Sequence, residues 1–402
     1  MRILLANDGF GDAGGVQSYL DAIAGGLGSR GHELAILHRD VTPGLFAAAA
    51  TRRLPQFSAG VDGLERTVDR VAAWRPDVCF SNNMNRLDVD RALIARWPVI
   101  KFMHGYFGTC IGGQKRHGFP VAQPCDRPFG RACLALYGPR HCGELNVGAF
   151  VRHYRWAVEQ RDLVTRYRAI VVASEHMKRE FVRNGADASQ VQVNPLFPTH
   201  DELPAACVAP DRAEDCVAFV GRMTVLKGGD LLVDAIARAA ARLGRTIRLL
   251  LIGDGPQRTA WERLAAERRV PFTSVGWLSG GARWQALRQA TLLALPSTWP
   301  EPFGLVGLEA GALGIPAVAF DVGGVREWLR PGVNGYLAPG NPPRASAFGD
   351  ALVQALDDRD GLHAMGLRAA NVAREMSLDR HLDRLQAIFA GAVPTYAHSA
   401  GR

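Results

Sequence analysis

Short apolar runs alternate with helix-like stretches along almost the whole chain, and this alternation restricts the possible folds more than any other feature. The runs are rich in Val, Ile and Leu and lack the polar alternation of a strand with one solvated face. We therefore expect parallel strands that are buried on both faces. In the first half such runs predict strands at Arg2–Asn7, Glu33–Leu37, Asp77–Ser81, Val99–His104, Ala169–Ser174 and Val191–Asn194.

One segment interrupts the alternation. The stretch "THDELPAACVAPDRAED", residues 199–215, is rich in Pro, Ala and acidic residues, which indicates a linker. Two blocks of alternating strands and helices predict an α/β protein with two doubly wound domains that face each other. A length of 402 residues also favours two domains. In the second block we expect strands at Cys216–Gly221, Ile247–Gly253, Thr273–Trp277, Leu292–Pro296 and Ala317–Asp321.

The predicted boundaries follow from this pattern. We expect an N-terminal domain at 1–200, a linker at 201–215 and a C-terminal domain at 216–376. The amphipathic stretch "SLDRHLDRLQAIFAGAV" predicts one more helix within 377–402, which would cross back to the N-terminal domain and end in a tail. Ligands of such sheets bind beyond the carboxyl ends of the strands, so we expect a site in the cleft between the domains.

The net charge of +8 narrows the classes of partner. Residues 1–200 contain 25 Lys and Arg against 18 Asp and Glu, whereas residues 201–402 contain 22 against 21. A basic N-terminal half fits an anionic ligand or an anionic membrane face. No RNA- or DNA-binding motif accompanies it, so we expect no nucleic-acid partner. No apolar run approaches the roughly 18 residues of a membrane span, no signal-peptide pattern is present, and the odd number of cysteines, seven, favours a reducing compartment. We expect a cytoplasmic protein.

The most informative stretch is "LLALPSTWPEPFGLVGLEAGALGIPAVAFDVGGVREWL", residues 292–329. Glu301 follows a strand in a loop, and Glu309 lies in an apolar helix that we expect to begin near Phe303 and Gly304. A carboxylate buried there without a partner would cost several kcal/mol, so we expect it to have one. The two hydroxyls of a ribose would serve, and the free amides of the helix start would suit a diphosphate.

A second stretch, "VAFVGRMTVLKGGDLLVDAI" at residues 217–236, places Arg222 just past a strand end and Lys227 five residues later. Two cations that project into a cleft suit a diphosphate whose charge grows as it leaves. The alternative is two solvated surface cations.

Glycines follow the first strand, at Gly9, Gly11, Gly14 and Gly15. The dinucleotide fingerprint G-x-G-x-x-G is missing, and no acidic residue ends the second strand as a simple ribose ligand would. The loop therefore does not indicate a dinucleotide site, and a tight turn into a helix is one interpretation of its glycines.

Together these features resemble the retaining glycosyltransferases of family 4, which have the GT-B architecture of two Rossmann-like domains facing a central cleft. The motifs that carry the resemblance are Gly221-Arg222 with Lys227-Gly228, the turn Gly253-Asp254-Gly255, and Glu301 and Glu309 separated by seven residues. Three further stretches match: "GLGSRGHELAIL", "VVASEHMKREFVRNG" at 171–185 and "DVGGVREWLRPGVNGYL" at 321–337. The resemblance covers essentially the whole chain.

The resemblance implies a role for each matching residue. Arg222 and Lys227 would grip the donor diphosphate, Glu309 would bind the ribose hydroxyls, and Glu301 would face the hydroxyls of the transferred sugar. His104, at the end of "VIKFMH", would lie beside the reacting sugar, although a lone histidine is more often structural. The implied catalytic residues are Glu301, His104, Arg222 and Lys227, and the implied donor-binding residues are Gly15, Arg222, Lys227, Gly253, Phe303, Gly304, Leu305 and Glu309.

A cysteine-rich insertion at about 105–145 departs from the common pattern and would lie on the acceptor side. It contains Cys110, Cys125, Cys133 and Cys142. A tetrahedral zinc site is conceivable, but no C-x-x-C pair is present, so we favour separate thiols and expect no metal.

The expected activity is transfer of a sugar, with retention, from a UDP or GDP sugar to a hydroxyl of a glycan or lipid-linked acceptor. No cofactor is expected, and the resemblance points to synthesis of a surface polysaccharide or glycolipid. The alternatives are a GT-B-fold sugar-nucleotide epimerase and a non-catalytic nucleotide-sugar-binding protein. The segment "VRHYRWAVEQRDLVTRYRAI", residues 151–170, interleaves five arginines with Tyr154, Trp156 and Tyr167. This composition fits peripheral contact with an anionic membrane at its inner face, or equally a solvated helix whose aromatic residues belong to the core.

Overall fold

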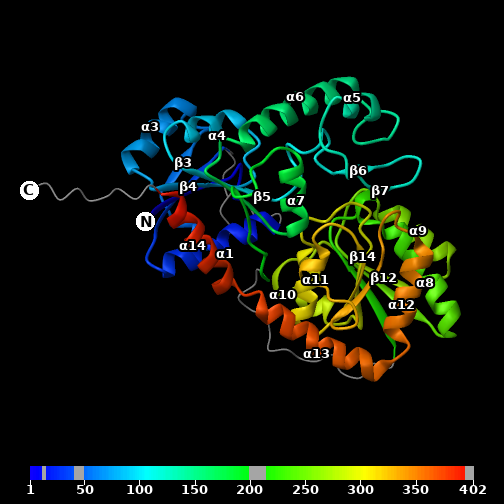
Figure 1. The fold of residues 1–402 in the computed structure, drawn as a ribbon. Coiled ribbons are helices and arrows are strands. Elements are labelled where there is room, and N and C mark those ends of the chain that lie inside the picture. Colours follow the sequence, from blue (N-terminus) through cyan, green and yellow to red (C-terminus); the bar gives the residue numbers. More distant parts are fainter. Residues whose placement is uncertain (11–14, 40–48, 199–213, 394–402) are drawn as a thin grey trace, which may run out of the picture.

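The computed structural model describes residues 1–10, 15–39, 49–198 and 214–393. Gly11, Gly14, nearly all of the expected linker and the last nine residues lie outside these ranges. Two parallel sheets form the centres of two domains, and helices cover both faces of each sheet (Figure 1). The predicted α/β architecture of two doubly wound domains is confirmed.

The N-terminal domain contains a seven-stranded sheet in which every pairing is parallel. In sheet order its strands are β3 (Gln56–Ser58), β2 (Glu33–His38), β1 (Arg2–Ala6), β4 (Val78–Ser81), β5 (Val99–Met103), β8 (Ala169–Val172) and β9 (Val191–Val193). Its helices are α1 (Gly15–Ser29), α2 (Ala49–Arg52), α3 (Leu64–Trp74), α4 (Leu87–Ile94), α6 (Val147–Val164) and α7 (Glu175–Arg183).

The C-terminal domain contains a six-stranded parallel sheet. In sheet order its strands are β12 (Phe272–Gly276), β11 (Ile247–Ile252), β10 (Asp215–Val220), β13 (Leu292–Leu295), β14 (Ala317–Asp321) and β15 (Gly335–Pro339). Its helices are α8 (Gly229–Leu243), α9 (Arg258–Glu267), α10 (Gly280–Leu287), α11 (Leu305–Ala312), α12 (Ala345–Leu356) and α13 (Arg359–Glu375).

Two strands of the parallel sheets were not predicted from the sequence, β3 and β15, and both lie at sheet edges. An edge strand pairs on one side only, so it tolerates the polar ends of Gln56–Ser58 and the Gly and Pro that bound Gly335–Pro339. Several predicted strands also extended one or two residues too far at their carboxyl ends. His104, for example, lies just past β5 and outside the ladder, in the loop that begins the cleft-facing edge.

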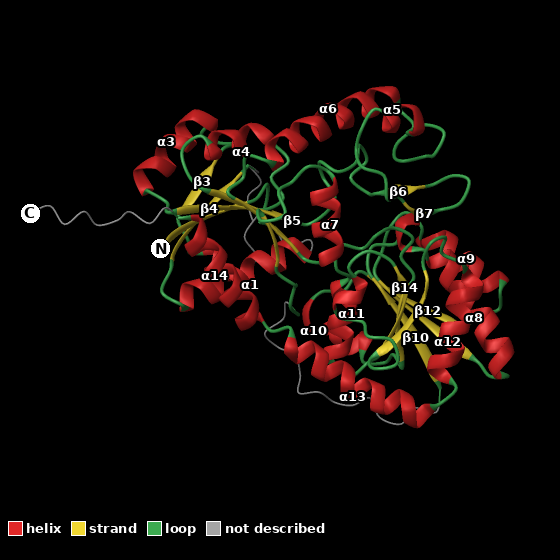
Figure 2. Ribbon diagram, viewed as in Figure 1, coloured by secondary structure: helices red, strands yellow, loops and turns green. Residues whose placement is uncertain are grey.

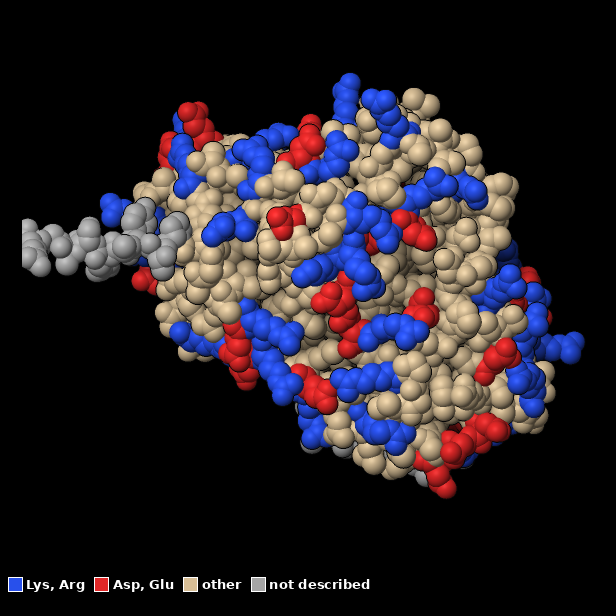
Figure 3. Space-filling model, in the orientation of Figure 1, with Lys and Arg blue, Asp and Glu red and all other residues tan. Residues whose placement is uncertain are grey.

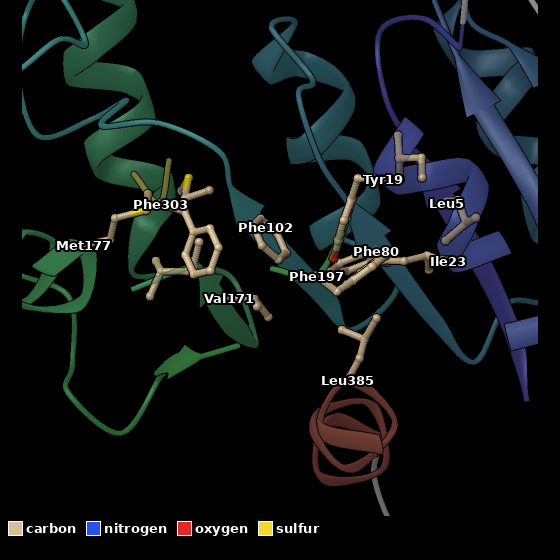
Figure 4. Close-up of a cluster of buried hydrophobic side chains, with 14 of the residues drawn as sticks. Leu5, Tyr19, Ile23, Phe80, Phe102, Val171, Met177, Phe197, Phe303 and Leu385 are labelled. Atoms are coloured by element: carbon tan, nitrogen blue, oxygen red, sulfur yellow. The ribbon is translucent and has the colours of Figure 1, made fainter. Parts of the chain in front are cut away.

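The last helix, α14 (Leu378–Ala392), follows α13 of the C-terminal domain but packs on the N-terminal domain. Its His381 Nε2 accepts a hydrogen bond from the Tyr19 hydroxyl of α1 at 3.0 Å. The apolar face of α14 completes the core of this domain: Figure 4 shows Leu385 directed toward Phe80 and Phe197, and the rings of Phe80 and Phe389 lie 5.3 Å apart. Ser377 caps the helix by accepting from the Arg380 amide at 3.3 Å.

The two domains are in direct contact through the start of α7. The Ser174 hydroxyl donates to the Pro302 carbonyl at 2.8 Å, and the Glu175 amide donates to Glu327 Oε1 at 2.7 Å. Phe303 of the C-terminal domain is 1% exposed and lies beside Met177 and Val171 of the N-terminal domain (Figure 4). The loop after β13 is therefore anchored on the N-terminal domain.

The segment between β5 and α6 consists mostly of loop (Figure 2), with two short strands, β6 (Arg116–His117) and β7 (Gln123–Pro124), and the short helix α5 (Ala132–Leu136). It has a small core of its own. A buried ion pair of 2.8 Å between Lys115 Nζ and Glu180 Oε2 joins it to α7. No helix within the described ranges is long and apolar enough to cross a membrane.

Candidate active site

The loops at the carboxyl edge of the C-terminal sheet are packed closely against one another. Gly228 has a φ of +62°, and a Cβ there would lie 2.1 Å from the Pro296 carbonyl oxygen, so only glycine fits. The Thr298 amide donates to the Leu226 carbonyl at 2.8 Å. These contacts hold the turn that carries Lys227 against the loop that carries Glu301.

Glu301 is 4% exposed and accepts three hydrogen bonds at a single oxygen. Its Oε1 lies 2.6 Å from Lys227 Nζ and 3.0 Å from Trp299 Nε1, and it also accepts from the Ser297 hydroxyl. No described residue donates to Oε2. The carboxylate is thus fixed by one oxygen and can offer the other to a ligand.

Glu309 is 3% exposed in α11, and its Oε2 accepts from Nη2 of Arg283 in α10. Burial raises the pKa of the Glu309 carboxyl, whereas the charge and hydrogen bond of Arg283 lower it. The partner that the buried carboxylate was expected to need is therefore present within the protein. The sequence analysis did not identify Arg283.

Arg222 and Gly253 lie in neighbouring loops. A Cβ on Gly253, which has a φ of +136°, would lie 2.0 Å from the Gly221 carbonyl oxygen. The Met223 amide donates to the Asp254 carbonyl at 2.8 Å, which ties the two loops together on either side of Arg222. The Arg222 side chain is exposed and forms no ion pair with any described residue.

The start of α11 has free donor groups. Gly304, with a φ of +82°, is the N-cap residue, and no side chain caps the helix, whereas the Gly307 amide donates to the Gly304 carbonyl at 3.0 Å; the amides of Leu305 and Val306 therefore have no partner among the described residues. The Phe303 carbonyl accepts from Trp328 Nε1 at 2.8 Å and its ring is buried at the domain contact. Phe303 could therefore meet a ligand only through its backbone.

His104 lies past the end of β5 in the N-terminal domain. Its Nε2 lies 2.9 Å from Asn82 Oδ1, and the Asn82 amide group donates to the Phe80 carbonyl at 3.3 Å. This arrangement places the proton on Nε2 and leaves Nδ1 as an acceptor. Burial, together with Lys101 and His381, lowers the pKa of His104 to about 3, so the ring is neutral at physiological pH.

Tyr106 brings the two halves of the site together. It lies two residues after His104, and its ring centroid is 6.3 Å from that of Trp299, which hydrogen bonds to Glu301. The carboxyl edges of the two sheets therefore face each other at this point. Gly15 is the first residue of α1, and no atom of the described residues lies within 4 Å of where its Cβ would be.

The structure thus groups Lys227 with Glu301, and the Gly221 turn with Gly253, but pairs Glu309 separately with Arg283. Sequence reasoning missed four contributors. Ser297 and Trp299 were inside the most informative stretch but lacked a reason to be singled out. The other two, Asn82 and Arg283, carry no local signal, because each acts through a partner that is distant in sequence.

The four cysteines of the insertion line one small cavity of about 30 Å³ together with His117. Burial, with smaller effects from the other three thiols, raises the pKa of Cys142 to about 12. Within the described ranges no group of three or more His, Cys, Asp or Glu is arranged so that it could hold a metal ion. That the four cysteines are separate thiols stays a prediction.

The aromatic residues of segment 151–170 pack against the protein: Tyr167 is buried, and Tyr154 and Trp156 are partly buried. The Tyr167 hydroxyl donates to Asp90 Oδ2 at 2.8 Å, and Trp156 Nε1 donates to the Asn85 carbonyl at 2.9 Å. Tyr154 packs with Phe129 and Phe150. Tyr154 and Trp156 therefore lie on the packed side of α6, and Tyr167 is buried beyond the end of that helix.

Known proteins resemble both domains. Residues 209–372 match the family described as glycosyl transferases group 1, and residues 14–196 match the glycosyl transferase 4-like domain. A D-inositol 3-phosphate glycosyltransferase from Nocardia farcinica is 31% identical over 398 residues, which cover 91% of this chain and 82% of the relative. The chain belongs to the family 4 glycosyltransferases.

Solved structures agree with this family 4 assignment at the level of the fold. Sucrose-phosphate synthase from Thermosynechococcus elongatus superposes with a TM-score of 0.70 at 20% identity, covering 97% of this chain and 98% of that one. HepE from Anabaena, solved in complex with UDP and glucose, gives 0.67 at 20% identity, covering 97% and 99%. The predicted GT-B fold and the glycosyltransferase class are confirmed.

Proposed function

We propose that this glycosyltransferase moves a sugar, with retention of anomeric configuration, from a nucleotide-diphosphate sugar to an acceptor hydroxyl. The observation that carries the proposal is the group formed by Lys227, Glu301, Ser297 and Trp299 at the edge facing His104. Lys227, a cation that can bind a phosphate, contacts Glu301 Oε1, and Glu301 Oε2 remains available for sugar hydroxyls.

The residues divide the chemistry between them. Arg222, Lys227 and the uncapped start of α11 supply positive charge where a leaving diphosphate gains negative charge. Glu301 Oε2 would accept hydrogen bonds from hydroxyls of the transferred sugar and so fix the orientation of that sugar. The neutral His104 would accept a hydrogen bond from a sugar hydroxyl at Nδ1, and the ring would stay uncharged beside the reacting carbon. The diphosphate itself would help to deprotonate the incoming hydroxyl on the same face, so no cofactor is required.

UDP is the first donor nucleotide to test, and GDP is the second. HepE, which shares the fold, was solved with UDP and glucose, and this supports UDP without deciding it for this chain. Membership of a glycosyltransferase family favours transfer over the epimerase and the non-catalytic binder.

For the acceptor, we propose a glycan or lipid-linked molecule of surface polysaccharide or glycolipid synthesis. The insertion and the start of α6 present six exposed apolar side chains. They are Phe119, Val121, Leu134, Leu145, Val147 and Val151. Exposed Arg127, Arg131, Arg152 and Arg155 accompany them, and Figure 3 shows basic side chains along the edge formed by α5 and α6. Arginines around apolar side chains suit a peripheral contact with an anionic membrane surface.

A phosphorylated cyclitol is the second candidate acceptor. The relatives from Nocardia farcinica and Gordonia bronchialis, 31% and 27% identical, are named as D-inositol 3-phosphate glycosyltransferases. The basic charge of the N-terminal half would suit such an anion as well.

A two-stage assay separates these possibilities. Melting temperatures with UDP, GDP and ADP would identify the nucleotide, because a ligand at 100 times its dissociation constant stabilises a protein by about 2.7 kcal/mol. Sugar nucleotides of the matching base would then be offered with a lipid-linked glycan or with inositol phosphate. Release of nucleoside diphosphate that depends on one acceptor would identify the acceptor class, and a C2- or C4-inverted sugar nucleotide formed without acceptor would favour the epimerase.

A further inference from the structure

Glu309 is already engaged at the position where the proposed donor would place its ribose. One oxygen, Oε2, accepts from Arg283 Nη2, and no described residue donates to Oε1. The exposed fraction is 3% for the Glu309 side chain and 21% for Arg283. The pair therefore combines a buried carboxylate with a guanidinium that is partly accessible.

The Arg283 guanidinium has donors to spare. It carries five N–H groups, and within the described ranges its one acceptor is Glu309. Its Cζ also lies 5.4 Å from the ring centroid of Trp284, and this cation–π contact limits the movement of the guanidinium in addition to the hydrogen bond with Glu309. A guanidinium held in this way can donate to a ligand without releasing the carboxylate.

The pair also lies where ligands of this fold bind. α10 follows β12 and α11 follows β13, so both helices start from the carboxyl edge of the C-terminal sheet. Figure 1 shows the two helices next to each other.

We propose that Arg283 is a positioning residue for the donor nucleotide. It fixes Glu309 by holding Oε2, leaves Oε1 to accept from one ribose hydroxyl, and donates a remaining N–H to the oxygen of the neighbouring hydroxyl. The ribose is then recognised by a carboxylate and a guanidinium together, with one hydroxyl donating and the other accepting. This inference rests on the proposed function, because it assumes that the donor is a nucleotide.

The charge of Arg283 keeps Glu309 competent as an acceptor. Burial raises the pKa of Glu309, and Arg283 is the charged group that opposes this effect. Without Arg283 the buried carboxylate would take up a proton at a higher pH. A protonated carboxyl is a weaker acceptor for a ribose hydroxyl, so donor affinity would decline as the pH falls.

Calorimetric titration with UDP, and with GDP if UDP does not bind, tests the proposal in the full-length chain between pH 6 and 8.5. We expect Arg283→Met to weaken binding at least about tenfold at pH 7, as for loss of a charged hydrogen bond, and to weaken it further at lower pH. Arg283→Lys should recover part of the wild-type pH dependence of binding, because lysine keeps the positive charge but lacks the planar, multiply donating guanidinium group. The control Arg242→Met removes a surface pair with Asp350 and should bind as the wild type does.

A second measurement separates an effect through Glu309 from a general loss of structure. In a Glu309→Gln background the added Arg283→Met change should lose only the hydrogen bond that Arg283 itself donates to the ribose, so it should weaken binding less than it does in the wild type, and the pH dependence should be absent from both variants. Wild-type affinity in Arg283→Met, or a uniform loss that leaves the pH profile unchanged, would overturn the proposal. If Arg283→Met does not fold, three other variants test the proposal: Arg283→Lys, Glu309→Gln and the double variant. The proposal is overturned if all three bind the nucleotide with wild-type affinity and wild-type pH dependence. A wild-type chain that binds neither nucleotide would contradict the proposed function itself, a separate result.

Discussion

Lys227 Nζ lies 2.6 Å from Glu301 Oε1, so the cation that we assign to the diphosphate and the carboxylate that we assign to the sugar are in contact. Each residue limits where the other can lie. A substitution of one should therefore disturb the other as well, and the two effects should not be additive.

We expect Lys227→Met and Arg222→Met each to lower kcat/KM by about 10²- to 10³-fold, comparable to the loss of one preorganised donor. The matched control is Arg268→Met, whose ion pair with Asp234 is on the surface. Steady-state kinetics with the identified donor measure all three variants. If neither site variant loses even tenfold while the control is unchanged, the diphosphate must bind elsewhere.

The two glutamates should separate binding from turnover. Glu309→Ala removes the carboxylate assigned to the ribose and should raise the dissociation constant of the nucleotide. Glu301→Ala removes a contact to the transferred sugar and should lower kcat more than it weakens nucleotide binding. Calorimetry with the free nucleoside diphosphate, alongside kcat, distinguishes the two. Equal effects of both substitutions on both quantities would contradict the division of roles.

Acid should destabilise the fold through two buried histidines. Burial lowers the pKa of His104 to about 3 and that of His381 to about 4, both below the usual value near 6.5. Because the unfolded chain takes up these protons at a higher pH than the folded chain, acidification below about pH 6.5 favours unfolding. We expect a loss of up to about 2 kcal/mol per histidine between pH 7.5 and pH 5.

Urea denaturation at the two pH values measures this effect. His381→Gln should reduce the difference in unfolding free energy between them, whatever it does to stability at pH 7.5. The control His141→Gln changes an exposed residue and should leave the difference unchanged. An unchanged pH dependence in His381→Gln would show that this histidine is not the source.

Membrane attachment should depend on salt and on the exposed arginines at the start of α6. Each basic residue near an anionic surface contributes up to about 1 kcal/mol, so Arg152→Glu with Arg155→Glu should release the chain from anionic liposomes. The control Arg263→Glu is on α9, where the side chain is 76% exposed. Sedimentation with anionic and neutral vesicles at low and high salt measures the binding. If the chain shows no preference for anionic lipid at low salt, the membrane proposal is contradicted, and the basic surface is better explained as a site for a soluble anionic acceptor.

Most of the fold could be predicted because its strands are continuous apolar runs. The runs at Arg2–Ala6 and Ile247–Ile252 are inner strands that are buried except at Arg2 and partly at Arg248, and they carry a strong signal. The edge strands β3 and β15 gave no such signal, since one side of each needs no partner. A fold assignment from sequence is strongest where burial is complete.

The candidate site was predictable only where its residues share one stretch of chain. Glu301 and Glu309 are separated by seven residues in one stretch, and a carboxylate inside an apolar helix can be singled out from the sequence alone. Arg283 is in "GGARWQAL", an ordinary helix start, and its pairing with Glu309 is visible only in three dimensions. The role of Asn82 likewise depends on the neighbouring strand that places His104 beside it.

The central claim is that the chain cleaves a nucleotide sugar and transfers the sugar with retention. Proton NMR of the first product formed, with the wild type and Glu301→Gln side by side, tests it most directly. We expect an α-linked donor to give an α-linked product, identified by its anomeric coupling constant, and Glu301→Gln to form it far more slowly. A β-linked first product, or no cleavage of any UDP or GDP sugar in the presence of either acceptor class, would contradict the account.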